Sequence, residues 1–290
     1  MIEISGRIGA PGRIAYGGDV VNVAVGLARL GQRPALLTAL GTDPWSEQLV
    51  AAWLDERIDL DLVARHPEKL PGLYGIQTDE LGERTFTYWR ENSAVRDLFA
   101  LPEAERLMAA AARADLLFLS GITLALYDDE QRARIAQAAK AVRARGGIVA
   151  FDGNYRPRLW PDASAARTAY ETFAPYVTLA LPTASDEKML RGYEETPEAI
   201  ARRWHDLGAN EVVVKLGAAG AYTSERHGDA HFVPAEKITP VDTSGAGDAF
   251  DAAYLTARLA GAPSHVAAAI GHGLAKTTIM HVGAIPPREQ

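Results

Sequence analysis

The segment from Val241 to Asp248, with the sequence VDTSGAGD, combines residue types that bind an anion and move a proton. It runs into residues 249–255, whose apolar side chains recur at helical spacing, so Gly245-Ala246-Gly247 lies where a helix begins. The first amides of a helix lack intrahelical acceptors and face the positive end of its dipole, which favours a phosphate. Asp248 is then either a helix-capping acid or the base that deprotonates a hydroxyl attacking the phosphorus.

Two further segments place polar side chains beside glycine or a strand end. Gly17 and Gly18 open a helix whose first turn carries Asn22, an amide suited to sugar hydroxyls, although a plain tight turn fits the same residues. Arg156 follows a buried strand that ends near Asp152, and ligands of open α/β sheets collect at the carboxyl ends of strands. In a chain that is acidic overall, Arg156 is a candidate cation for an anionic ligand.

A fourth segment, Val214 to Ala221, is predicted to be a strand leading into a glycine-rich turn. Lys215, Gly217 and Gly220 within it suit a close approach of the backbone to a nucleotide, but turns of this kind are common.

Residues 73–78 and 84–90 alternate between apolar and polar side chains, which predicts two strands of a hairpin joined by residues 79–83. This register places Tyr74 on one face of its strand, and Tyr88 and Arg90 on one face of the partner strand. The hairpin is either an edge of the sheet or a lid over a ligand. Arg90, at the end of an aromatic face, favours ligand contact.

The remaining chain alternates short apolar strands with amphipathic helices, the pattern of a mostly parallel sheet covered on both faces. The strands are expected at residues 35–40, 116–120, 148–152, 177–181 and 211–216. Helices are expected at 20–30 and 128–145, with Ser46 as the N-cap of another and Pro197 in the first turn of a helix that ends near Gly208.

Composition excludes several functions. Among 290 residues, 30 Lys and Arg stand against 37 Asp and Glu, so no global basic field exists for nucleic acid or an anionic membrane. Cysteine is absent, which removes disulfides, thiolate metal sites and cysteine nucleophiles. His227 and His231 flank a predicted turn and lack metal-site spacing. No signal-peptide core or membrane-length apolar run is found, and a cytoplasmic protein is expected.

The absence of three known motifs disfavours further classes of enzyme. The sequence contains no P-loop, no dinucleotide-binding G-x-G-x-x-G after the first strand and no G-x-S-x-G elbow. P-loop hydrolysis, Rossmann dehydrogenation and α/β-hydrolase chemistry are therefore disfavoured.

The segments GGDVVNVAVGLARLG, from Gly17, and DTSGAGDAFDAAYL, from Asp242, resemble the two signatures of the ribokinase-like (pfkB) carbohydrate kinases. The similarity covers nearly the whole chain, and TYWRENSAVR and DGNYRPRLW resemble the versions found in 2-keto-3-deoxygluconate kinases. The resemblance implies a three-layer α/β/α sandwich with a mostly parallel central sheet, one domain over residues 1–290 and a small β-sheet lid from about 1–16 and 71–91. It also implies transfer of the γ-phosphate of Mg·ATP to the terminal hydroxyl of this sugar acid.

Carried over to matching positions, the resemblance assigns roles to individual residues. Asp248 is implied as the base, with the amides of Gly245, Ala246 and Gly247 as the anion hole. Sugar contacts are implied for Gly18, Asn22, Tyr74 and Tyr88, with Arg90 and Arg156 holding the carboxylate. The nucleotide side is implied for Lys215, Gly217, Gly220, Gly245, Gly247 and Gly283. Mg²⁺ is implied, through water, at Asp186 or Glu187, and a monovalent cation such as K⁺ near Asp242.

The sequence departs from the family in three places. Thr183-Ala-Ser-Asp186 stands where many members have Asn-x-x-Glu, Ser244 stands where Thr is more usual, and the chain begins inside the element that usually follows a first apolar strand. Two alternatives therefore stay open: a fructokinase or other neutral-sugar kinase of the same fold, and a catalytically impaired sugar-binding protein. Exposed lid edges favour a homodimer over a monomer.

Overall fold

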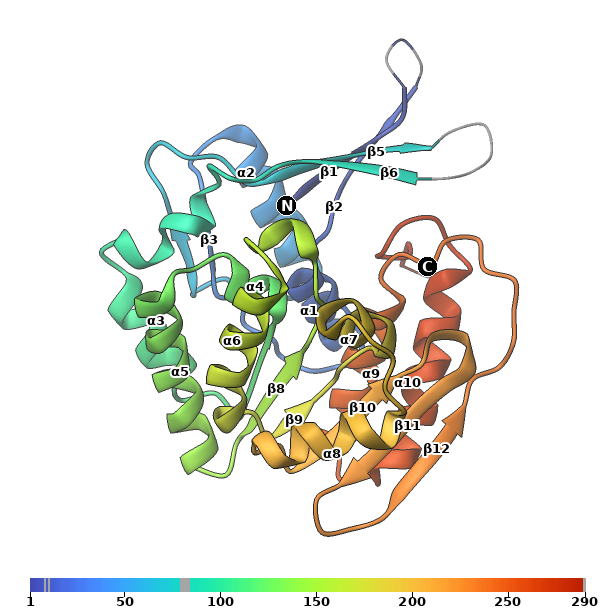
Figure 1. The fold of residues 1–290 in the computed structure, drawn as a ribbon. Helices are drawn as coiled ribbons and strands as arrows, with labels where there is room; N and C mark the ends of the chain where they lie inside the picture. Colours follow the sequence, from blue (N-terminus) through green and yellow to red (C-terminus); the bar gives the residue numbers. More distant parts are fainter. Residues whose placement is uncertain (8, 10, 79–83, 289–290) are drawn as a thin grey trace. The chain divides into compact units, whose positions relative to one another are not determined.

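A computed structural model describes residues 1–7, 9, 11–78 and 84–288. The chain divides into two compact units, Met1–Leu107 and Met108–Gln290. Figure 1 draws the chain with its elements coloured along the sequence. One domain carrying a lid stays a prediction. The first unit contains a four-stranded sheet and a two-stranded sheet of β3 and β4, and the second unit contains a six-stranded sheet.

The first unit contains a four-stranded sheet with the order β2-β1-β5-β6, called here the N-terminal sheet. Its strands are β1 (Ile2–Ser5), β2 (Arg13–Tyr16), β5 (Leu73–Thr78) and β6 (Arg84–Trp89). β5 and β6 pair antiparallel with Tyr74 opposite Tyr88, which confirms the predicted hairpin and its register. β1 pairs parallel to β5 and antiparallel to β2, so the N-terminal strands do share a sheet with the hairpin. Residues 79–83, predicted to join the hairpin, lie outside the described residues.

The first unit also holds α1 (Asp19–Arg29), β3 (Thr38–Leu40), α2 (Pro44–Asp55), β4 (Val63–Arg65), a 3-10 segment (Ala94–Ala100) and the start of α3 (Ala104–Ala111). The prediction of Ser46 as the N-cap of α2 was wrong. Asp43 caps this helix, because its carboxylate accepts the backbone N–H of Trp45 and of Ser46. Ser46 lies in the first turn, where its hydroxyl donates to Asp43 and accepts the N–H of Gly41.

The second unit contains a six-stranded sheet with the order β12-β11-β10-β9-β8-β7. Its strands are β7 (Leu116–Ser120), β8 (Ile148–Asp152), β9 (Leu179–Ala180), β10 (Glu211–Lys215), β11 (Gly220–Glu225) and β12 (Ala230–Pro234). β7 to β10 run parallel, and β11 and β12 extend the sheet as an antiparallel hairpin. The predicted strand at 177–181 shortens to two residues, partly because Pro182 has no N–H to continue the ladder.

The helices of this unit are α4 (Gly121–Ala125), α5 (Asp129–Ala144), α6 (Ala163–Phe173), α7 (Ala184–Arg191), α8 (Pro197–Leu207), α9 (Ala246–Leu259) and α10 (Ser264–Ile279). α9 and α10 lie side by side (Figure 1). Gly271 permits this approach, since a Cβ there would lie 2.7 Å from the ring of Phe250. No helix in the described part of the chain is long and apolar enough to cross a membrane.

Candidate active site

The parallel strands of the second unit direct polar residues to one edge of their sheet. β7, β8 and β10 end at Ser120, Asp152 and Lys215, and Asp186 follows the end of β9 in the first turn of α7. Because parallel strands end at a common edge, these residues gather at the place where α/β sheets bind ligands. The predicted strand at residues 148–152 is confirmed, and Arg156 follows its end.

Helix α9 begins at this edge, as the sequence predicted. Gly245 is its N-cap in a left-handed conformation, with φ of 73°, and a Cβ there would lie 2.7 Å from the carbonyl oxygen of Ala284. Glycine is therefore required both for the backbone angle and for the close approach of the C-terminal turn. Asp248 lies in the first helical turn and is partly exposed, beside the amides that begin the helix.

Asp242 holds the loop before α9 in place. Its carboxylate accepts the backbone N–H of Ser244 at 2.8 Å and that of Gly283 at 2.6 Å, and the side chain is buried. The structure thus brings together Asp242, Gly245 and Gly283, three residues that the sequence assigned to the nucleotide and cation side.

Lys215 is buried in an ion-pair cluster with two carboxylates. Its Nζ lies 3.1 Å from Oδ2 of Asp152 and 3.0 Å from both carboxylate oxygens of Asp251. The predicted turn follows β10: Gly217 begins a 3-10 turn over Gly217–Ala219, and Gly220 is the first residue of β11. Sequence reasoning missed Asp251. One feature of the sequence could have identified it: Asp251 is an acid three residues after Asp248, inside the apolar stretch of α9, where a charged residue needs a partner.

Arg156 and Asp186 form an ion pair at the same edge. Nη1 of Arg156 lies 3.3 Å from Oδ2 of Asp186 and also donates to the carbonyl of Tyr155 at 2.8 Å. Burial raises the pKa of Asp186, although Arg156 opposes the shift. Asn154 lies between Asp152 and Arg156 with φ of 34°, a left-handed conformation that is uncommon outside glycine.

Glu187, the other residue implied for Mg²⁺, is engaged elsewhere. One carboxylate oxygen accepts the indole N–H of Trp204 at 2.8 Å, and the other accepts Nη2 of Arg203 at 3.0 Å. Asp186 therefore has the better geometry of the two for a metal at the site edge. Within residues 1–7, 9, 11–78 and 84–288, no group of three or more acidic or histidine side chains forms a ready metal site.

In the first unit, Gly17, Tyr74 and Glu3 pack closely on the N-terminal sheet. The hydroxyl of Tyr74 donates to Oε2 of Glu3 at 2.5 Å, and a Cβ on Gly17 would lie 2.6 Å from that hydroxyl. Burial and the Glu3 carboxylate raise the pKa of Tyr74, so the phenol stays a donor. The rings of Tyr74 and Tyr88 are 6.0 Å apart on the same face. Sequence reasoning missed Glu3, because the strand pattern alone does not distinguish a buried acid from an exposed one.

Arg90 is buried without a carboxylate to neutralise it. The side chain is 8% exposed, and its Cζ lies 4.2 Å from the ring centroid of Tyr88. Burial lowers the pKa of Arg90. Among the residues that the structure describes, no acid lies within ion-pair distance of this guanidinium. In the same unit, Gly18 is the N-cap of α1 with φ of 130°, and the N–H of Asn22 donates to its carbonyl at 2.8 Å.

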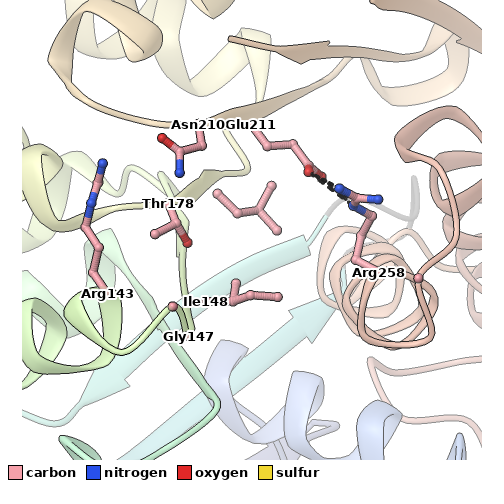
Figure 2. Close-up of a pocket in the computed structure, with 10 residues that line it drawn as sticks. Arg143, Gly147, Ile148, Thr178, Asn210, Glu211 and Arg258 are labelled. Carbon is pink, nitrogen blue, oxygen red and sulfur yellow. Dashed lines mark hydrogen bonds and ion pairs between the residues drawn. The ribbon is translucent and has the colours of Figure 1, made fainter. Parts of the chain in front are cut away.

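A cavity of about 530 Å³ lies at the opposite edge of the second unit's sheet, where β8, β9 and β10 begin (Figure 2). Figure 2 shows Glu211 and Arg258 turned toward each other, and Arg258 Nη2 lies 2.5 Å from Oε2 of Glu211. Arg143 on the other side donates to the carbonyls of Pro175, Val177 and Gly208. Since both arginines are already held by protein groups, this cavity is not the candidate site.

Known proteins resemble this chain in sequence and in fold. The pattern of the family described as pfkB family carbohydrate kinase matches residues 10–290. A 2-dehydro-3-deoxygluconokinase of Dickeya dadantii is 42% identical, covering 100% of this chain and 95% of the relative. A fructokinase of Klebsiella pneumoniae is 33% identical over 87% of this chain and 80% of its own length. The crystal structure of a PfkB protein from Polaromonas sp. JS666 has a TM-score of 0.83 at 30% identity, covering 98% and 94% of the two chains, and confirms the predicted α/β fold class.

Proposed function

We propose that this chain, which belongs to the pfkB family of carbohydrate kinases, phosphorylates 2-dehydro-3-deoxygluconate (2-keto-3-deoxygluconate) at its terminal hydroxyl with ATP as the donor. That it is a carbohydrate kinase follows from the family. The choice of a sugar acid rests on chemistry within the chain.

The observation that carries the choice is Arg90. A buried guanidinium that forms no ion pair with any described acid costs free energy unless a ligand supplies negative charge at contact distance. A planar carboxylate satisfies the guanidinium fork, whereas a neutral sugar does not. Tyr88 beneath the guanidinium holds its plane in one orientation.

Arg156 is the second proposed carboxylate ligand. Its guanidinium is half exposed at the strand edge of the second unit and is paired with Asp186 at 3.3 Å. An exposed pair of this kind contributes little, so a substrate carboxylate can compete for the same fork. Sugar hydroxyl contacts are proposed for Gly18, Asn22, Tyr74 and Tyr88, as the resemblance implies.

The proposed reaction uses the start of α9. Asp248 takes the proton of the terminal hydroxyl as its oxygen attacks the γ-phosphorus, and the bond to the ADP oxygen breaks. The amides of Gly245, Ala246 and Gly247 stabilise the negative charge that develops on the phosphoryl oxygens. Gly217, Gly220 and Gly283 are proposed on the nucleotide side, where their glycine backbones permit close approach.

Mg²⁺ fits this site through Asp186, a largely buried carboxylate that is ion-paired with the half-exposed Arg156 and whose pKa burial raises. Bound there through water, the ion supplies positive charge to the phosphates. K⁺ near Asp242 fits less well, because both oxygens of that carboxylate already accept backbone N–H groups.

A homodimer is proposed through the N-terminal sheet. Ile4 and Ile14 are paired across β1 and β2, and Trp89 lies on the same face, opposite to that of Tyr74 and Tyr88. These three side chains are 42%, 59% and 58% exposed, a clustered apolar face that a second copy would cover. Sedimentation should give a dimer for the wild type and a monomer for Trp89→Asp, while a monomeric wild type would exclude this assembly.

The function is tested by following ADP release with a panel of acidic and neutral sugars. The proposal expects 2-dehydro-3-deoxygluconate to have the highest kcat/KM. Preference for fructose would favour the fructokinase alternative, which the 33% identical relative keeps open. If sugars bind but no sugar of the panel causes ADP release, the chain is a sugar-binding protein that has lost catalysis.

A further inference from the structure

Three titratable side chains from three elements meet inside the second unit. The proposed phosphoryl transfer gives this cluster no role. Asp152 ends β8, Lys215 ends β10 and Asp251 lies on α9. They are 4%, 7% and 0% exposed, respectively. Lys215 Nζ lies within 3.1 Å of three carboxylate oxygens, one from Asp152 and two from Asp251.

The ammonium group has no donor to spare for a ligand. An ammonium has three N–H donors, and three carboxylate oxygens lie within hydrogen-bond distance of this one. Burial alone would lower the pKa of Lys215, but the carboxylates of Asp152 and Asp251 outweigh it and raise this pKa, so the charge is kept. Lys215 therefore acts on neighbouring groups and not by direct contact with the nucleotide.

The cluster lies under the start of α9. Asp251 follows Asp248 by three residues, which places both on one side of the helix. A Cβ on Gly247 would lie 3.8 Å from Lys215 Nζ, so the ammonium is next to the first helical turn. Since two carboxyl groups surround this ammonium, its charge is offset within the cluster, and the cluster acts on the helix start through geometry.

The same cluster holds the turn after β8. The free side of the Asp152 carboxylate, Oδ1, accepts the N–H of Asn154 at 3.1 Å, while Oδ2 pairs with Lys215. Asn154 is held there in its left-handed conformation, two residues before Arg156. The ion pair therefore joins the turn that carries Arg156 to the helix that carries Asp248.

We propose that Lys215 is a positioning residue for phosphoryl transfer: its ammonium fixes the first turn of α9 against the turn after β8. This inference rests on the proposed function for the roles of Asp248 and Arg156. A buried ion-pair cluster is a poor source of stability compared with apolar packing, so we place its value in the geometry that it fixes.

The chain offers a matched control on the same two elements. β10 and α9 are joined at their other ends by Glu211 and Arg258, 2.5 Å apart at the closest atoms. Tyr254 also donates to Glu211. This second pair lies at the edge of the sheet where β10 begins, away from the start of α9.

The test compares Lys215→Met, the double variant Lys215→Met/Asp251→Asn and the control Arg258→Met/Glu211→Gln. The first double variant keeps the formal charge of the cluster and removes one of the two carboxyl groups, that of Asp251, which Lys215→Met leaves without an ammonium. Melting temperature, kcat and KM are measured with ATP and whichever sugar of the panel the wild type phosphorylates fastest.

Lys215→Met is expected to lower the melting temperature by roughly 5–10 °C. The charge-matched double variant should recover most of that loss, yet keep a kcat at least about 10-fold below wild type with sugar KM changed less than about threefold. The control should lose stability and keep its kcat. Recovery of kcat together with stability in the double variant would overturn the inference and leave the proposed function intact. A wild type that phosphorylates no sugar of the panel would overturn both.

Discussion

The guanidinium of Arg90 lies over the ring of Tyr88, with Cζ 4.2 Å from the ring centroid. These residues are two apart on one strand and its end, so their side chains share a face, and the aromatic ring fixes the plane of the cation. A buried cation that lies over an aromatic ring and forms no ion pair with a described acid, although Glu91 and Asp19 act on it from further away, is arranged for an anionic ligand.

Replacing Arg90 should therefore lower the activity without lowering the stability of the fold. Arg90→Met is expected to lower kcat/KM for the sugar acid by about 10- to 100-fold, because a charge-assisted hydrogen bond contributes about 1.5–3 kcal/mol. Since the same change removes a buried charge, the melting temperature should stay constant or rise by up to about 3 °C. Steady-state kinetics and calorimetry on one preparation measure both. A large loss of stability would mean that Arg90 has a structural partner.

Asp248 gives the most direct test of chemistry. Asp248→Asn preserves the shape of the first turn of α9 but removes the proton acceptor, so kcat should fall by a factor on the order of 10²–10⁴. Sugar affinity, measured by calorimetry without ATP, should change little. If the variant retains wild-type turnover, Asp248 is only a helix-capping acid.

The sequence allowed prediction of the elements that carry the site because their signals are local. α9 begins where the glycine pair Gly245 and Gly247 predicted, and β7 and β8 have the predicted bounds. The hairpin register, with Tyr74 opposite Tyr88, followed from alternation alone. In each case the pattern needed only neighbouring residues.

The features that could not be predicted depend on contacts between distant residues. Lys215 and Asp251 are 36 positions apart, and nothing in either segment reveals that they pair. The hydroxyl of Tyr74 meets Glu3 across 71 positions. Ser46 was a plausible cap by type, but Asp43, one residue before a proline that starts the helix, took that role.

Arg156 is expected to control preference between sugars. Arg156→Ala should lower kcat/KM for acidic sugars by about 10- to 100-fold and leave neutral sugars within about threefold, because only the acid needs the guanidinium fork. Arg156→Lys, which keeps the charge without the fork, should recover only part of the loss. Equal kinetics for wild type and Arg156→Ala would remove this residue from the carboxylate site.

Asp186 and Glu187 are adjacent acids with different predicted roles. Glu187→Ala should destabilise the fold by about 2–4 kcal/mol, because it leaves the indole N–H of Trp204 and a buried part of Arg203 without their acceptor. Its kcat at saturating Mg²⁺ should remain near wild type. Asp186→Asn should instead raise the Mg²⁺ concentration needed for half-maximal rate. The opposite pattern would assign the metal to Glu187.

The pH dependence of stability distinguishes Asp186 further. Burial raises the pKa of its carboxyl in the folded state, so the folded protein binds this proton more tightly than the unfolded chain. Ionised Asp186 therefore destabilises the fold at neutral pH, and the cost disappears as pH falls through the raised folded pKa toward the unfolded value of about 3.9. Without Mg²⁺, Asp186→Asn should melt above wild type at pH 7, and the difference should shrink as the pH is lowered. A constant difference from pH 7 to pH 4 would show that titration of Asp186 does not contribute.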